Sequence, residues 1–255
     1  MEFIILLFVF VFGAIIGSFL NVVILRYNTG RSIVSGRSIC FSCGDKLCWY
    51  NLLPIVSFTL QKGRCSRCLS KISWQYPSVE ILTAISMTYL YSIFGPSVGF
   101  VFYSIILSLL VVISVYDLRH QIIPEGPVYL LIVIGAIKLI FIYLYSSNDI
   151  AISSMFDGIV LFLFLGSFWI FSDGVWMGFG DAKLVLGLGL FFPLCLGVTA
   201  LTYAFWIGAV VGVLINLLHK KIREIPFAPF IIMGFIIVFV FHSNLFSYLG
   251  SLCIK

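Results

Sequence analysis

The sequence predicts an all-α polytopic membrane protein with about eight transmembrane helices and a small zinc-ribbon-like loop domain after the first helix. Of its 255 residues, 62% are hydrophobic and only 10% are charged, whereas soluble domains carry roughly 25% charged residues. A water-soluble fold of this length could not bury so much apolar surface. The loop domain is predicted by a polar, basic segment at 25–77 that contains four paired cysteines.

A spanning helix needs about 20 predominantly apolar residues. The candidate spans are roughly 2–24, 79–95, 98–116, 127–146, 156–172, 183–196, 199–218 and 229–248. The first is interpreted as a retained helix, because its start holds Glu2 instead of a base and its apolar run is too long for a signal peptide. The sixth candidate is short. The chain is thus divided into a first helix (1–24), the loop domain (25–77) and a membrane core of about seven helices (78–255).

Basic residues predict the orientation of these helices. Of the 15 Lys and Arg residues, 13 fall on one side of the membrane in this arrangement. Because cytoplasmic loops carry the excess of positive charge, that side is expected to be cytoplasmic and both termini periplasmic. Eight of these bases lie between the first two helices, and the others are Arg119, Lys183, Lys220, Lys221 and Arg223. The net charge of +5 therefore reflects membrane topology, and no nucleic-acid partner is expected.

The loop domain carries a predicted metal site. Cys40-x-x-Cys43 is followed 21 residues later by Cys65-x-x-Cys68, and four thiolates in two such pairs suit tetrahedral zinc. Disulfides are the alternative, but a cytoplasmic loop is kept reduced. Cys48 is a nearby fifth thiol and a weaker candidate because its spacing from Cys43 differs. With four cysteine ligands the ion has no open position, so its expected role is structural.

Two aspartates are predicted at the same membrane face. Asp117 ends the third predicted helix in "SVYDLRHQIIP", and Asp181 starts the sixth in "GFGDAKL". A capping role fits Asp181, because the positive end of the helix dipole lies at the helix start. The same account fits Asp117 badly, since it stands at a helix C-terminus, although Arg119 could offset its charge.

Their chemistry as a pair suggests a third interpretation. Two carboxylates in a low-dielectric site cannot both ionise easily, so one keeps a proton. The ionised group can take a proton from water while the protonated group donates to a carbonyl, which is how a peptide bond is hydrolysed without a covalent intermediate. Gly178 and Gly180 would let backbone approach a substrate closely. Paired membrane acids can also relay protons, so a transporter remains an alternative. The other alternative is a non-enzymatic pilus or secretion assembly factor whose zinc loop recruits partners.

The order of several motifs resembles the bacterial type IV prepilin peptidases, within the intramembrane aspartyl proteases with a Gly-x-Gly-Asp motif. The resemblance runs from about residue 12 to 190. The motifs are "GSFLNVVILR" (17–26), "CFSC" (40–43), "GRCSRC" (63–68), "ISWQYPSVE" (72–80), "DLRHQIIP" (117–124) and "GFGDAKL" (178–184). Phe179 stands where Met is common and Glu125 where Asp is common, and neither change touches the aspartate pair.

This resemblance implies cleavage of a basic leader from type IV prepilins or type II secretion pseudopilins at the cytoplasmic face of the bacterial inner membrane. It implies Asp117 and Asp181 as the catalytic pair, with Gly178, Gly180 and Lys183 in support. Many members also methylate the new N-terminus with S-adenosylmethionine. Gly63, Arg64 and Glu80 are candidates for that second activity, although Glu80 could equally be a first-turn acid favoured by the helix dipole.

Overall fold

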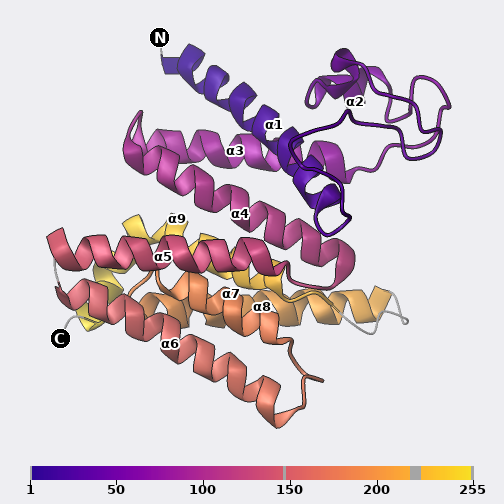
Figure 1. Cartoon of the computed structure of the whole chain (residues 1–255). Helices are drawn as coiled ribbons and strands as arrows, with labels where there is room; N and C mark the ends of the chain where they lie inside the picture. The colour runs from indigo at the N-terminus through magenta and orange to yellow at the C-terminus, as the bar shows by residue number, and fades with distance from the viewer. Residues whose placement is uncertain (1, 146–147, 219–224, 254–255) are drawn as a thin grey trace. The chain divides into compact units, whose positions relative to one another are not determined.

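The structure, a computed structural model, describes residues 2–145, 148–218 and 225–253, and these residues are mostly helical, apart from the loop at 27–74 (Figure 1). The basic turn at 219–224, used above to assign orientation, lies outside the described residues. The elements in chain order are α1 (Glu2–Arg26), the 3-10 helix η1 (Trp49–Leu52), α2 (Val56–Leu60), α3 (Gln75–Phe94), α4 (Val98–His120), α5 (Glu125–Tyr145), α6 (Asn148–Phe171), α7 (Phe179–Gly189), α8 (Leu194–Leu218) and α9 (Ala228–Cys253).

The chain is a multi-pass membrane protein, as its composition predicts. Among the described residues, five helices are long and apolar enough to cross a membrane: α1, α4, α5, α6 and α8. The count of eight spans stays a prediction. The bounds predicted for the sixth span, 183–196, are wrong, because the helix breaks after Gly189 and resumes at Leu194. Pro193 lacks an amide hydrogen and disfavours helical backbone at the residue before it, which accounts for the break.

The chain folds as two compact parts, residues 1–112 and 113–255. In the first part, α1 and α3 pack against each other through glycine. A Cβ at Gly17 would lie 2.8 Å from Glu80 Cα, so only a residue without a side chain permits this approach. Asn21 also donates a side-chain hydrogen bond to the Tyr76 carbonyl at 3.2 Å. Packing of α1 on α3 therefore brings the two ends of the intervening loop together.

In the second part, the short helix α7 packs against α5, α6, α8 and α9. Leu184 and Val185 are completely buried there. Gly189 meets Gly158 of α6 so closely that a Cβ would lie 2.6 Å from the Gly158 Cα. With 11 residues, α7 is about 16 Å long and reaches roughly half-way across a hydrocarbon core. The neighbouring helices therefore fix the position of α7, and with it the position of Asp181.

Candidate active site and metal centre

Asp181 lies in the first turn of α7 but does not cap that helix. Gly178 occupies the N-cap position with extended backbone, and no side chain caps the helix there. The Asp181 amide donates to the Gly178 carbonyl at 3.1 Å, which places the aspartate three residues inside the helix. Its side chain is buried, and Oδ1 has no hydrogen-bond partner. Asp181 is therefore near the favourable end of the α7 dipole without serving as a cap.

Asp117 stands in the last turn of α4, where its own helix dipole is unfavourable. The structure resolves this difficulty through a second helix. The Asp117 carboxylate, only 4% exposed as a residue, accepts a hydrogen bond from the Ala228 amide at 3.3 Å. Ala228 is the first residue of α9. The positive end of the α9 dipole thus meets the charge that α4 disfavours.

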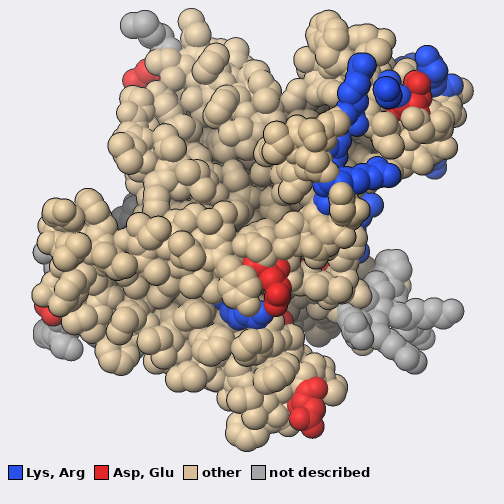
Figure 2. All heavy atoms as spheres, in the orientation of Figure 1, with Lys and Arg blue, Asp and Glu red and all other residues tan. Residues whose placement is uncertain are grey.

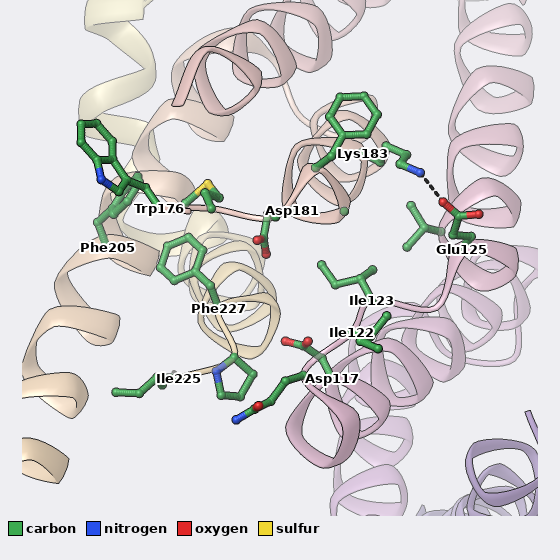
Figure 3. A pocket seen from close by; sticks show the side chains of 17 residues that line it. Asp117, Ile122, Ile123, Glu125, Trp176, Asp181, Lys183, Phe205, Ile225 and Phe227 are labelled. Atoms are coloured by element: carbon green, nitrogen blue, oxygen red, sulfur yellow. Dashed lines mark hydrogen bonds and ion pairs between the residues drawn. The ribbon is translucent and has the colours of Figure 1, made fainter. Parts of the chain in front are cut away.

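The two aspartates share one pocket of about 730 Å³. Figure 3 shows both carboxylates pointing into this space, Asp117 from α4 and Asp181 from α7. They are near enough that the charge of Asp117 acts on the Asp181 carboxyl group. The rest of the wall is mostly apolar, with Ile123, Phe205 and Phe227 among the lining residues. This arrangement sets two acids beside a largely apolar space, where electrostatic interactions are stronger than in water.

The predicted supporting residues Gly178, Gly180 and Lys183 line the same pocket. A Cβ at Gly180 would lie 3.0 Å from Ile123 Cβ, so the backbone is tightly packed there. Lys183 donates to Glu125 Oε1 at 2.5 Å and to the Tyr129 hydroxyl at 3.3 Å. Figure 3 shows this ion pair as a dashed line to the upper right of Asp181. The pair joins α5 to α7 at the pocket wall.

Other lining residues were missed by sequence reasoning. Helix α8 contributes Phe205 to the pocket, the segment before α9 contributes Ile225, Pro226 and Phe227, and Ala228 contributes the amide that binds Asp117. The signal in the sequence was Pro226, because proline often stands at a helix start. That signal locates a helix start. It does not indicate which distant residue accepts hydrogen bonds from the amides of the first turn, which have no partner within the helix.

The four predicted metal ligands form one cluster. The Sγ atoms of Cys40, Cys43, Cys65 and Cys68 all lie within 4.8 Å of one another, and those of Cys40 and Cys68 are 3.9 Å apart. Four sulfurs at about 2.3 Å around a tetrahedral zinc ion would be about 3.8 Å apart, so the donor set fits zinc. Cys48 is outside the cluster.

The two cysteine pairs are built alike. The Gly44 amide donates to the Cys40 carbonyl at 2.9 Å, and the Leu69 amide donates to the Cys65 carbonyl at 3.0 Å. Backbone hydrogen bonds from Cys43 and Ser42 lower the pKa of the Cys40 thiol to about 6. They favour the thiolate, which is the form that binds a metal. The two turns thus share one backbone geometry, which places all four sulfurs in the same cluster.

The three methyltransferase candidates are not brought into one pocket among the described residues. Arg64 lines a pocket of about 500 Å³ on the loop, and neither Gly63 nor Glu80 belongs to its lining. Glu80 is buried and accepts a hydrogen bond from the Ile55 amide at 2.8 Å, which ties the loop to α3. The carboxylate of Glu80 is engaged by this hydrogen bond and does not face the pocket that Arg64 lines. These three residues do not share a pocket among the described residues that could hold S-adenosylmethionine, their role stays a prediction, and no step is assigned to the cofactor.

Comparison with known proteins identified two family models. The Bacterial Peptidase A24 N-terminal domain matches residues 11–94, and the Type IV leader peptidase family matches residues 104–213. Several relatives carry the name prepilin leader peptidase/N-methyltransferase, and three of them illustrate the similarity. The Bacillus subtilis protein is 32% identical over 247 residues, covering 94% of this chain and 95% of the relative. The Legionella pneumophila protein is 30% identical, covering 84% and 76%, and the Vibrio cholerae protein is 29% identical, covering 94% and 98%. No solved structure matched the chain.

Proposed function

The chain belongs to the type IV leader peptidase family, and from that membership we propose that it is a membrane aspartic endopeptidase. Its proposed substrates are type IV prepilins or type II secretion pseudopilins, from which it removes a basic leader. The observation that carries the proposal is the pair of buried carboxylates, Asp117 and Asp181, aimed into one pocket (Figure 3). Such a pair is the arrangement that hydrolyses a peptide bond by acid and base catalysis.

The hydrogen bonds suggest which acid takes which role. The Ala228 amide donates to Asp117, and a donor of this kind stabilises a negative charge. Asp181 also receives a backbone hydrogen bond, from Gly178, but its Oδ1 is buried with no partner among the described residues, which disfavours its charged form. Asp117 would take a proton from the attacking water, and protonated Asp181 would donate to the scissile carbonyl oxygen. The water oxygen then bonds to the carbonyl carbon, and transfer of a proton to the amide nitrogen accompanies cleavage of the C–N bond.

The pocket wall supports a substrate with an apolar residue near the scissile bond. Phe205 and Phe227 offer aromatic contact, while Gly178 and Gly180 leave room for substrate backbone. A basic leader needs acids along its path, since the bases of this chain would repel it. Glu125 is the acid proposed to meet it, because its side chain is 67% exposed at the pocket despite the ion pair with Lys183.

We place the proposed active face at the cytoplasmic side of the bacterial inner membrane, with both termini periplasmic. The support is the distribution of Lys and Arg along the chain. Structural zinc is proposed for the four-cysteine cluster, where it would fix the fold of the loop. It would take no part in hydrolysis, because four cysteine ligands leave no position for water.

A second activity, N-methylation of the new amino terminus, is supported by the names of the relatives. Mass measurement of the cleaved product tests it: addition of a methyl group with S-adenosylmethionine present raises the mass by about 14 Da, since the cofactor carries the chemistry. A product that never gains this mass would make the protein a peptidase only.

The peptidase proposal is tested by incubating the purified protein with a candidate prepilin and measuring product mass. Asp117→Asn and Asp181→Asn should each abolish cleavage without preventing membrane insertion, because each group must exchange protons. Asp149→Asn and Asp157→Asn are matched controls outside the pocket lining, and both should keep most activity. Full cleavage by a stably inserted Asp181→Asn protein would contradict the proposed chemistry and leave the transporter and assembly-factor alternatives.

A further inference from the structure

A second pocket, of about 500 Å³, lies on the loop between α1 and α3. Its lining combines two bases, Lys62 and Arg64, with two leucines, Leu60 and Leu69. Both leucines face outward, with 78% and 66% of their surfaces exposed. Exposed apolar side chains beside basic ones are the composition of a surface that meets the headgroup and acyl boundary of a membrane.

Two residues that line this pocket, Lys62 and Leu69, have left-handed backbone. Leu69 has φ of 57°, a left-handed conformation that Cβ sterics disfavour. The corresponding position of the other cysteine turn is Gly44, with φ of 73° and the same backbone hydrogen bond. The cysteine turn therefore sets the left-handed backbone at both positions, and position 69 carries a leucine where the matching position holds glycine. Lys62, in the same lining, also has a positive φ of 51°. Strained residues of this kind cluster at functional sites.

The charge around the pocket favours an anionic ligand. Residues 27–74 hold seven Lys and Arg and one acid, Asp45. Asp45 pairs with Arg67 at 2.9 Å, and within the described residues no ion pair involves Lys62 or Arg64. Figure 2 shows the blue Lys and Arg atoms gathered on the lobe that carries α2. The two bases are therefore available to bind an anion.

We propose that Leu60, Lys62, Arg64 and Leu69 form a binding site for the phosphate headgroup of an anionic membrane phospholipid. The bases complement the phosphate, and the exposed leucines can contact an acyl chain. A dissolved anion without an acyl chain would make no use of these leucines. The loop follows directly on α1, a membrane-length helix, so a leaflet is within its reach. A basic substrate leader is the poorer occupant, because its charge has the same sign as the pocket. This site goes beyond the proposed peptidase function and does not depend on it.

Hydrogen exchange of the full chain in lipid nanodiscs tests the site. Amides of residues 60–71 should exchange more slowly in phosphatidylcholine discs containing phosphatidylglycerol than in pure phosphatidylcholine discs. Each base near an anionic surface strengthens binding about fivefold. The double variant Lys62→Gln with Arg64→Gln should therefore lower the affinity of the loop for phosphatidylglycerol roughly 30-fold, and the slowing of amide exchange should decrease accordingly. Arg37→Gln with Lys46→Gln removes the same charge from the same loop outside the pocket lining, and should leave most of the protection.

Leu69→Gly separates a lipid role from a folding role. The change relieves the left-handed backbone, so the thermal midpoint should not fall, yet the protection by phosphatidylglycerol should decrease. Equal exchange in the two kinds of disc would overturn the proposal, as would equal loss of protection in the two double variants. Protection in pure phosphatidylcholine by inorganic phosphate or S-adenosylmethionine would assign the pocket to a soluble ligand instead. Prepilin cleavage in the same discs reports the peptidase separately, because Asp181→Asn should keep the lipid effect.

Discussion

Replacing Gly189 by alanine should displace the helix that carries Asp181. A Cβ at this position would lie 2.6 Å from Gly158 Cα and 2.8 Å from Gly158 N. Both are backbone atoms of α6, so no side-chain rotation can relieve the overlap. Ordinary contact between carbon atoms is about 3.5–4.0 Å, so α6 and α7 must separate locally by about 1 Å.

Two opposing contributions set the size of the effect. Overpacking costs about 1–3 kcal/mol, and the higher helix propensity of alanine returns about 0.5–1 kcal/mol. The expected net loss of stability therefore lies between about 0 and 2.5 kcal/mol. Because a misplacement of about 1 Å at a catalytic group can cost roughly 100-fold in rate, cleavage should fall more than stability does.

The measurements are kcat/KM on a prepilin substrate and the thermal unfolding midpoint in one detergent. Gly166→Ala is the matched control, since it lies in α6 and an added Cβ would have nothing within 4 Å. That variant should keep its activity and its midpoint or raise the latter slightly. If Gly189→Ala matched the unmodified protein in both measurements, close packing between α6 and α7 would not be what positions Asp181.

Three further predictions concern the metal, the ion pair and the topology. Cys65→Ser should abolish zinc binding and unfold the loop, because metal-binding energy is folding energy in such modules. Cys48→Ser should still bind one ion, as measured by elemental analysis. Equal metal content in the two variants would refute the four-cysteine site. Glu125→Gln and Lys183→Met should couple by about 0.2–1 kcal/mol in a double-mutant cycle of unfolding, since the glutamate is 67% exposed, and strict additivity would mean the pair contributes nothing. A reporter fused at Ile55 should read cytoplasmic, and a periplasmic signal there would invert the proposed active face.

The cysteine cluster was predictable from the sequence, because its geometry depends on residues that are neighbours in the chain. Two Cys-x-x-Cys pairs form turns with nearby backbone donors, so their spacing already predicted a cluster, and the four sulfurs do lie together. The short sixth helix shows the opposite case. Hydrophobicity continues across residues 190–193, and the helix ends there all the same, so composition misplaced its bounds. The effect of Pro193 on the residue before it is the local signal that was not used.

The sequence alone determined the chemical types and their order: a membrane chain, four paired thiols suited to a metal ion, and two acids placed near helix ends. Only the tertiary structure decided which distant groups meet these acids. The Ala228 amide that binds Asp117 is 111 residues away in sequence, and Glu125 is 58 residues from Lys183. Helix periodicity describes which residues share one helix, but it carries no information about which helices pack together. The roles proposed for the two aspartates therefore depend on the packing of α4, α7 and α9, because that packing brings the Ala228 amide to Asp117 and buries Asp181 Oδ1 with no hydrogen-bond partner among the described residues.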